Sequence, residues 1–316
     1  MLYMERTFQM ENFEQLFAIL NTEAQKEKEG TYLEGLLVAL EKWLDGELDI
    51  NIDNVAKEEV RKAIQIAILK GMREGTQPNH QMTPDTFGFL LSFFVEQAFE
   101  QELQAGKSLT VTDLAVGTGN LLYALMNAFD GKIEATGVEV DELLIQLAAA
   151  TANLLEQPVE LHHQDALKDL LIDPADAIVC DLPYGYYPNE EVALDYELCA
   201  TEGMSYAHHL FIEQSVNYVK EGGYLFFLVP ATLFESEQAQ QLHKYLKKHV
   251  WIQSVIQLPE NLFTSRAHEK SILVLQKKSD ALRAPKEVLL AKVPNMQNKE
   301  ALAMFFEKVR MWKENK

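Results

Sequence analysis

The chain has little cysteine and no long apolar run. Its 316 residues include two cysteines, Cys180 and Cys199, and neither belongs to a Cys-x-x-Cys pair. This spacing argues against a disulfide framework and against a thiolate zinc site. No uninterrupted apolar run reaches the roughly 18 residues that a membrane span needs, and acidic residues stand where a signal peptide would be basic and then apolar. We therefore expect a cytoplasmic protein that does not enter a membrane.

Basic residues are also scarce. The sequence has 28 Lys and Arg against 48 Asp and Glu, which gives a formal net charge of -20. Between Ile133 and Val219 the only basic residue is Lys168. Nonspecific affinity for nucleic acid comes largely from Lys and Arg against the phosphate backbone, so this composition gives nucleic acid little support as a partner. The content of 47% hydrophobic and 24% charged residues indicates a globular chain rather than a fibrous or disordered one.

The hydrophobic pattern divides the chain into two domains. Residues 1–75 have apolar positions at helical spacing, and the breakers Gly71, Gly75 and Pro78 cluster at their end. We therefore predict a helical N-terminal domain over residues 1–75 and a second domain over residues 76–316.

Strands alternate with helices from Thr83 onward. The predicted strands are residues 108–115, 132–138, 159–162, 177–180, 224–229, 252–257 and 271–276. The predicted helices are residues 84–104, 119–129, 141–155, 206–219 and 236–249. This alternation predicts an α/β fold, with a parallel sheet covered by helices on both faces.

Three loops follow the first three predicted strands, where doubly wound sheets bind their ligands. The first loop runs from Asp113 through Gly117 and Gly119, and glycines there let the backbone pass close to a ligand. Glu139 lies 22 residues beyond Gly117, at a spacing suited to an acid that holds ribose hydroxyls. Asp165 follows the third strand and can meet an adenine amino group. The alternatives are a structural turn without a ligand, or a dinucleotide site, which would need a third glycine where Leu122 stands.

Together these loops resemble those of the Rossmann-like S-adenosylmethionine-dependent methyltransferases. The resemblance implies S-adenosyl-L-methionine as the cofactor, with Glu139 on its ribose, Asp165 on its adenine and Asp113 or its neighbours facing its methionine. The cofactor-binding residues that it implies are Met82, Thr83, Asp113, Ala115, Gly117, Thr118, Gly119, Asn120, Leu121, Glu139, Val140, Asp165 and Ala166.

The loop after the fourth strand carries the sequence Asp-Leu-Pro-Tyr at residues 181–184. This sequence resembles the Asp-Pro-Pro-Tyr motif of methyltransferases that modify adenine in DNA. An exocyclic amine is a poor nucleophile, so the site needs acceptors that become stronger partners as the nitrogen gains positive charge. The resemblance implies that the Asp181 carboxylate and the Leu182 carbonyl are these acceptors. It also implies that Pro183 fixes the turn and that Tyr184 stacks on the flipped base.

Residues flanking these loops extend the likeness to most of the chain. Residues 80–85, 222–234 and 258–263 resemble segments of the modification subunits of type I restriction systems. The chain as a whole is similar to the YtxK-like group of bacterial proteins, described as adenine-specific DNA methyltransferases. This resemblance implies a methyltransferase domain over residues 76–316, with one antiparallel strand in a mostly parallel sheet, behind the N-terminal helical domain.

Two departures from the family pattern affect the expected function. Leu182 stands where the motif has its first proline, so the loop loses one φ constraint. After Gln276 only 40 residues remain, too few for a target-recognition domain, so any choice of DNA sequence would come from a protein partner. Candidate phosphate contacts are Lys244, Lys247, Lys248, Arg266 and Lys270, although the lysines at 244–248 also fit the polar face of a helix.

The leading hypothesis is therefore an N-methyltransferase that acts on adenine in nucleic acid, with DNA as the expected substrate. The alternatives are a regulatory or scaffold protein that binds the cofactor without turnover, and a protein-amide methyltransferase, although Asp181 stands where that class has Asn. Residues 186–188 (Tyr-Tyr-Pro) are interpreted as a base-stacking wall or an apolar lid. The pairs His162-His163 and His208-His209 are poor metal clusters, because adjacent side chains diverge; satisfied surface or core histidines are expected, and no metal site.

Overall fold

The computed structural model describes residues 12–27, 29–52, 55–75, 82–263 and 265–314. The chain forms two compact units. The first unit consists of Met1–Met82, Gly117–Asn120 and Asp141–Pro158, and the second of Thr83–Val116, Leu121–Val140 and Val159–Lys316. The domain division at residues 75 and 76 stays a prediction.

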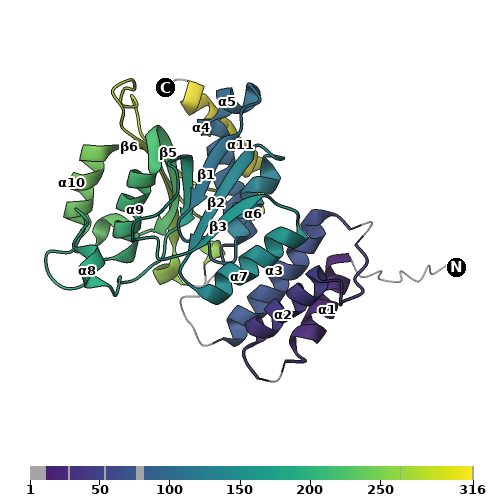
Figure 1. Ribbon diagram of the computed structural model, residues 1–316. Coiled ribbons are helices and arrows are strands. Elements are labelled where there is room, and N and C mark those ends of the chain that lie inside the picture. The colour runs from purple at the N-terminus through teal and green to yellow at the C-terminus, as the bar shows by residue number, and fades with distance from the viewer. Residues whose placement is uncertain (1–11, 28, 53–54, 76–81, 264, 315–316) are drawn as a thin grey trace. The chain divides into compact units, whose positions relative to one another are not determined.

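The first unit is a group of helices. It contains α1 (Asn12–Ala24), α2 (Tyr32–Leu44), α3 (Lys57–Glu74) and α7 (Glu142–Leu154), which lie side by side in Figure 1. Leu36, Leu40 and Ile64 are fully buried between them, together with Leu147 of α7. Burial of this shared apolar surface stabilises helices that would be marginal in isolation.

The second unit is built on one eight-stranded sheet of order β3-β2-β1-β4-β5-β7-β6-β8. The strands are β1 (Leu109–Asp113), β2 (Ile133–Glu139), β3 (Val159–His163), β4 (Ala175–Asp181), β5 (Val219–Pro230), β6 (Val250–Gln257), β7 (Lys270–Lys277) and β8 (Leu289–Lys292). Every pairing is parallel except the two made by β7, which runs antiparallel to β5 and β6. The expected α/β fold, mostly parallel with one antiparallel strand, is confirmed.

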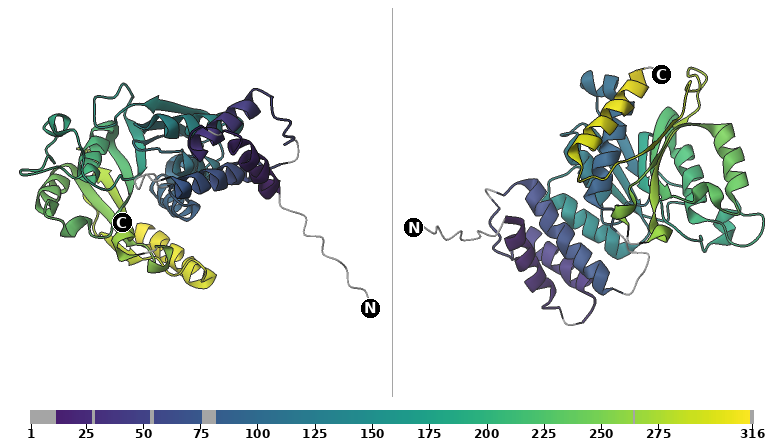
Figure 2. Two further views of the ribbon diagram at one scale, coloured as in Figure 1. Left: turned by 90° about the horizontal axis from the view of Figure 1, so that it is seen from below. Right: turned by 180° about the vertical axis from the view of Figure 1, so that it is seen from behind.

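Helices cover both faces of this sheet (Figure 2). On β5, Leu225 and Phe227 belong to the hydrophobic cluster under α9 (Ala207–Tyr218) and α10 (Ala239–His249). Tyr224 lies on the opposite face and packs edge-on against Phe99, next to α4 (Asp85–Ala98). Side chains alternate between the faces of a strand, so β5 is apolar on both sides and lies in the core.

The remaining helices complete the α4 face. α6 (Asn120–Ala128) packs closely on α4, because a Cβ on Gly88 would lie 2.9 Å from that of Ala124. α11 (Lys299–Glu314) packs on α4 through Phe306, whose ring centroid lies 4.4 Å from that of Phe93. In the described part of the chain, no helix is long and apolar enough to cross a membrane.

Some predicted elements differ from those observed. The single helix predicted over residues 84–104 is wrong, because Phe99 leaves the helical conformation (φ -112°, ψ 24°) and separates α4 from α5 (Glu100–Gln104). The short helix α8 (Glu190–Ala193), strand β8 and helix α11 were not predicted.

Candidate active site

Four acidic residues end strands, or follow them, at one edge of the sheet in the second unit. Asp113 ends β1, Glu139 ends β2, Asp165 follows β3 and Asp181 ends β4. The parallel register aligns these ends, since Asp113 pairs with Gly137 and Glu139 pairs with His163. The structure therefore brings together the acids on which the sequence interpretation rested.

Asp113 is almost completely buried, with 2% of its surface exposed. Its carboxylate accepts a hydrogen bond from the Ala115 amide (3.0 Å) and contacts the thiol of Cys180 on β4. Burial raises the pKa of Asp113 to about 7, and the charges of Asp181 and Glu139 add to the effect of burial. A cationic ligand nearby would favour the ionised carboxylate, so this acid suits a site for a positively charged group.

The end of the glycine loop, Gly117–Asn120, belongs to the first unit. Gly117 has φ +55° and Gly119 has φ +84°, which an L side chain rarely adopts, and a Cβ on Gly117 would meet nothing within 4 Å. Asn120 is buried and accepts a hydrogen bond from the Arg61 guanidinium (2.7 Å) of α3. Arg61 has 3% of its surface exposed and also pairs with Glu58, so it holds the end of the loop. The sequence interpretation missed Arg61.

The ends of β2 and β3 are joined by backbone contacts. The Gln164 amide donates to the Glu139 carbonyl (2.9 Å), and His163 Nε2 lies 3.0 Å from the Val140 carbonyl oxygen. The Glu139 carboxylate accepts from the Val140 amide (2.9 Å), and Val140 is 64% exposed. These contacts fix the backbone that carries Glu139 at the sheet edge.

Both oxygens of the Asp165 carboxylate are hydrogen-bonded. The Leu167 amide donates to Oδ1 (3.0 Å), and the Tyr187 hydroxyl donates to Oδ2 (2.6 Å). The neighbouring Ala166 is buried, and its carbonyl accepts from the Gln214 side chain (2.7 Å). Tyr187 therefore joins the loop after β3 to the loop after β4, a role that neither interpretation of residues 186–188 included.

Asp181 contacts two side chains that are far from it in the sequence. The Thr83 hydroxyl donates to Oδ2 (2.9 Å), and the Lys270 ammonium donates to Oδ1. The side chains of Lys270 and Asp181 are 24% and 16% exposed, so this ion pair is mostly withdrawn from solvent. Lys270 was predicted as a phosphate contact, and the structure shows it paired with the candidate catalytic acid.

Leu182 makes a backbone contact that a proline could not make. Its N–H donates to the Leu228 carbonyl of β5 (3.1 Å), which extends the pairing of β4 and β5 by one step. A proline has no N–H, so the residue that departs from the motif adds a hydrogen bond that the motif's proline would forgo. The expected loss of a φ constraint is thus offset by a backbone contact.

Aromatic rings line the motif loop (residues 182–188) after Pro183. Tyr184 is 69% exposed, and its inner side stacks on His208, with ring centroids 5.6 Å apart and planes 16° apart. Tyr206 stacks on the other side of this cluster, 5.1 Å from His208 and 5.0 Å from Tyr186. Tyr184 therefore presents an open ring three residues after Asp181, with His208 stacked on its inner side.

The buried histidines behind Tyr184 are neutral. Burial lowers the pKa of His208 to about 4 and that of His209 to about 3. Nδ1 of His208 and both ring nitrogens of His209 have no hydrogen-bond partner among the described residues, so the expectation of satisfied histidines is wrong for this pair. Across the described ranges, no three His, Cys, Asp or Glu side chains cluster closely enough to hold a metal ion.

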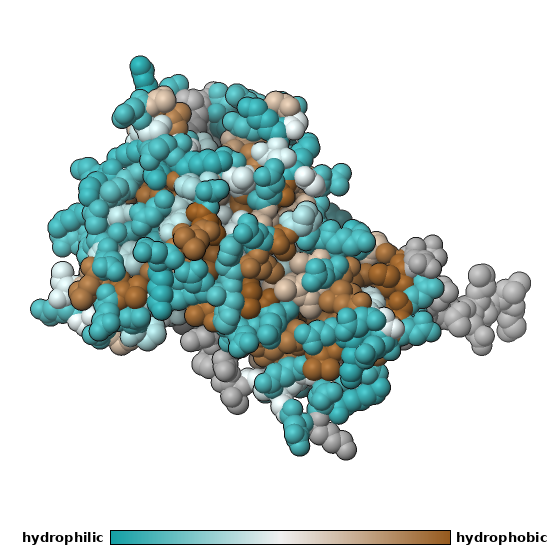
Figure 3. All heavy atoms as spheres, in the orientation of Figure 1, coloured by the Kyte–Doolittle hydropathy of each residue, from teal (hydrophilic) through white to brown (hydrophobic). Residues whose placement is uncertain are grey.

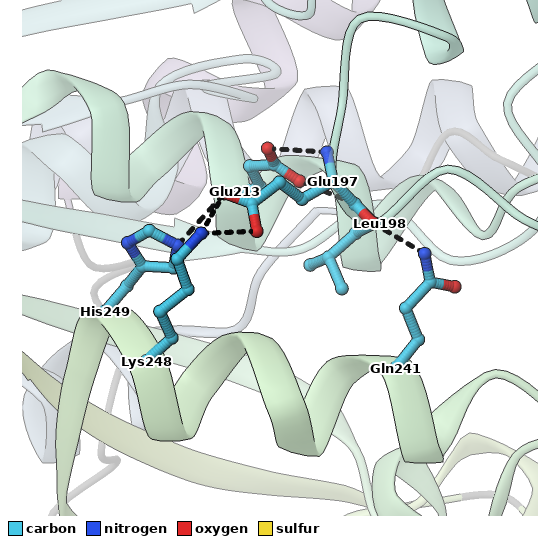
Figure 4. Close-up of polar contacts among 6 residues, drawn as sticks. All are labelled: Glu197, Leu198, Glu213, Gln241, Lys248 and His249. Carbon is cyan, nitrogen blue, oxygen red and sulfur yellow. Dashed lines mark hydrogen bonds and ion pairs between the residues drawn. The ribbon is translucent and has the colours of Figure 1, made fainter.

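A polar network attaches the segment after the motif loop to α9 and α10 (Figure 4). Glu197 pairs with Lys248 (2.9 Å) and His249 (3.1 Å) of α10, and its amide donates to Glu213 of α9 (2.9 Å). Gln241 of α10 donates to the Glu197 carbonyl (2.6 Å). Lys248, another predicted phosphate contact, is therefore paired with an acid.

The other predicted cofactor residues occupy varied positions. Thr118 and Leu121 are buried, and Met82 packs against the hydrophobic cluster of the first unit. Thr83 contacts Asp181, as described above. The assignment of all these residues to a cofactor stays a prediction.

Comparison with known proteins gives a consistent set of relatives. Residues 90–310 match the family model N-6 DNA Methylase, and residues 38–72 match the YtxK N-terminal helical domain. The protein YtxK of Bacillus subtilis (strain 168) is 48% identical over 256 residues, which cover 81% of this chain and 77% of YtxK.

Solved structures agree with these sequence matches. A protein of Listeria monocytogenes, assigned to the class I S-adenosylmethionine-dependent methyltransferases, is 40% identical, with a TM-score of 0.88 over 95% of this chain and 98% of that one. The type I restriction-modification methyltransferase subunit from Streptococcus thermophilus is 15% identical, with a TM-score of 0.66 over 94% and 74% of the two chains. The second likeness concerns the fold alone.

Proposed function

Because this chain belongs to the N-6 DNA Methylase family of S-adenosylmethionine-dependent methyltransferases, we propose that it methylates the exocyclic amine of adenine in nucleic acid, with DNA as the substrate. We place the reaction in the cytoplasm, where nucleic acid and cofactor are both present. The observation that carries the proposal is that Asp181 ends β4 and is followed, three residues later, by the exposed ring of Tyr184.

Residues that the sequence assigns to the cofactor have properties that suit it. Gly117 leaves open space beside the backbone, and Asp113 is an acid that a positive charge would ionise. In our proposal, residues 113–121 hold the methionine part, Glu139 and Val140 hold the ribose, and Asp165 and Ala166 hold the adenine. When bound, S-adenosylmethionine supplies a methyl group on a sulfonium, from which a nucleophile can take it.

Asp181 and Tyr184 would act on the substrate base. An adenine stacked on Tyr184 would direct its amino group to the Asp181 carboxylate and the Leu182 carbonyl, which accept its two N–H bonds. The nitrogen gains positive charge as it bonds to carbon, so a carboxylate stabilises this transition state more than the ground state. The surplus proton leaves the nitrogen after transfer, and Asp181 is the group placed to receive it.

The ion pair of Asp181 with Lys270 supports a second candidate function. The ammonium occupies one of the oxygens that would receive the amine, and its charge opposes a second positive charge at that point. Reaction is therefore disfavoured while the Lys270 ammonium stays on Asp181. A chain that never displaces it would bind the cofactor as a regulatory or scaffold protein without turnover.

Transfer of a labelled methyl group tests the proposal. Purified protein with radiolabelled S-adenosylmethionine is offered DNA, RNA and protein, and we expect label in N6-methyladenine. Asp181→Ala should abolish this label while the cofactor affinity measured by calorimetry stays within about threefold, because Asp181 acts on the substrate.

The other outcomes identify the alternatives. Label in a glutamine or asparagine side chain would contradict the adenine assignment and favour a protein-amide methyltransferase. Tight cofactor binding without label in any substrate would favour the regulatory function. Target choice, in our proposal, comes from a protein partner, so a cell extract fraction added to the DNA reaction is a useful further arm.

A further inference from the structure

Tyr187 is the inward-facing tyrosine of the motif loop. Tyr184 and Tyr186 are 69% and 57% exposed, whereas Tyr187 is 8% exposed and belongs to the hydrophobic cluster beneath α9. Its hydroxyl donates to Asp165 Oδ2 at 2.6 Å, a short distance typical of a hydrogen bond to an ionised group. The strongest polar contact of this ring is thus made with the loop that follows β3.

The backbone holds Tyr187 in this position. Its amide donates to the Ser205 carbonyl (2.9 Å), and the Ala207 amide donates to the Gly185 carbonyl (2.9 Å). Gly185 has φ +120°, which allows the chain to turn Tyr184 outward and Tyr187 inward within four residues. The orientation of Tyr187 is therefore set by the same turn that exposes Tyr184.

The phenol remains a donor at neutral pH. Burial, followed by the hydrogen bond and charge of Asp165, raises the pKa of Tyr187 well above its ordinary value. A carboxylate has about four acceptor positions, and Leu167 and Tyr187 use two of them. Asp165 can therefore accept a further donor while its plane is fixed by two existing contacts.

We propose that Tyr187 is a positioning residue: it orients the Asp165 carboxylate toward the adenine amino group of the cofactor and so couples cofactor binding to the loop that carries Tyr184. The inference rests on the assignment of Asp165 to the adenine in the proposed function. According to this inference, the cofactor bound at the loop after β3 influences the conformation of the motif loop, which contacts the substrate. It also explains why a buried hydroxyl follows the motif at this position.

Calorimetry with a pair of ligands tests this role. S-adenosylhomocysteine carries the adenine amino group, and S-inosylhomocysteine carries a carbonyl oxygen in its place. We expect Tyr187→Phe to bind S-adenosylhomocysteine about tenfold more weakly, since a hydrogen bond to a charged group is worth roughly that factor. The same variant should bind S-inosylhomocysteine within about twofold of the parent chain, because no amino group is left for Asp165 to receive.

Tyr196→Phe is the matched control. Tyr196 is also buried in this cluster, and its hydroxyl donates to the Leu167 carbonyl (2.7 Å) of the same loop, without touching the Asp165 carboxylate. We expect this variant to bind both ligands within about twofold of the parent. Hydrogen exchange gives a second readout: S-adenosylhomocysteine should slow exchange of amides 184–187 in the parent and in Tyr196→Phe, but not in Tyr187→Phe at equal saturation.

Equal weakening of both ligands by Tyr187→Phe would overturn the inference, because it would indicate a merely structural hydroxyl. Equal effects of the two tyrosine variants would overturn it as well. The proposed function can fail independently. If the variants show the expected pattern of ligand affinities but the parent labels no adenine, the inference about Tyr187 stands and the proposed substrate is wrong. Thermal unfolding of each variant checks that the fold persists.

Discussion

Burial of the Asp113 carboxyl makes stability depend on pH. The pKa of Asp113 rises from 3.8 to about 7 in the folded chain, so between these values the folded state binds a proton that the unfolded state does not. The free energy of unfolding therefore falls as pH rises through this window, and the penalty is complete above it. Asn cannot ionise, so we expect the Tm of Asp113→Asn relative to the parent to rise by several degrees as the pH increases from about 4 to about 7.

The expected gain should level off above that window. Differential scanning calorimetry of both chains in matched buffers measures it, and Glu134→Gln, a change at an exposed residue of β2, is the control. Two parallel Tm profiles for Asp113→Asn and the parent would contradict a raised pKa. At low pH we expect the two Tm profiles to cross, because the hydrogen bonds of the protonated Asp113 side chain then make the parent the more stable chain.

At the residue scale, the sequence predicted the acids and missed their partners. Asp113, Glu139 and Asp181 end apolar strands, and strand ends can be read from local periodicity. Arg61 and Lys270 contact site residues that are 59 and 89 positions away, and no local pattern records such a pairing. A signal did exist for Lys270, since it begins a strand whose next six residues are all buried.

The direction of β7 explains why Lys270 reaches Asp181. β7 is the antiparallel strand, so it begins at the edge where the parallel strands β4 and β5 end. Its first residue, Lys270, pairs with Pro230, the last residue of β5. Because β5 lies between β7 and β4, one strand separates Lys270 from the end of β4. A parallel strand in this place would have put a lysine at its start on the opposite edge of the sheet.

Removal of this lysine should destabilise the fold. Lys270→Met leaves the Asp181 charge without its main partner in a site that is mostly withdrawn from solvent, and we expect a loss of about 2 kcal/mol in the free energy of unfolding. Adding Asp181→Asn should restore most of this loss, because the unpaired charge is then gone. Urea unfolding of the single and double variants measures both effects.

Lys292→Met provides the control for that comparison. Lys292 pairs with Glu260 at 3.1 Å, but the two side chains are 52% and 61% exposed, so solvent screens the pair and little change is expected. If Lys270→Met also left the free energy of unfolding unchanged, the contact with Asp181 would be too weak to oppose a substrate. The second candidate function would then lose its support.

Element types in the second unit were predictable where burial was strongest. β4 and β5 are apolar on both faces, and such strands are clear in the sequence. β8 has no buried residue, and α11 buries only Phe305 and Val309 among its 16 residues, so their apolar pattern is too weak to predict either element. α7 was predicted as a helix, but its place in the first unit depends on contacts with α2 that periodicity does not encode.

At the scale of the whole molecule, negative charge limits contact with DNA. The net charge is -20, and two of the five candidate phosphate contacts, Lys248 and Lys270, are held by acids. Hydrophilic side chains cover much of the surface over α9 and α10 (Figure 3), but the segment after the motif loop carries Glu190, Glu191 and Glu197. The long-range field of the chain therefore repels a polyanion, whatever the motif loop can do at close range.

We accordingly expect weak binding to DNA in the absence of a partner. Near physiological salt, the dissociation constant for a nonspecific duplex should exceed about 10⁻⁴ M, at the weak end of the range for proteins that bind DNA nonspecifically. Fluorescence anisotropy of a labelled duplex measures it, with salt varied at fixed pH. Glu197→Gln, which releases Lys248, should strengthen binding and steepen its salt dependence, since one more cation can then neutralise a phosphate. Micromolar affinity of the parent chain for the duplex would show that the lysines leave their acidic partners to bind phosphate. A specificity-providing partner would then be unnecessary for delivery of the substrate.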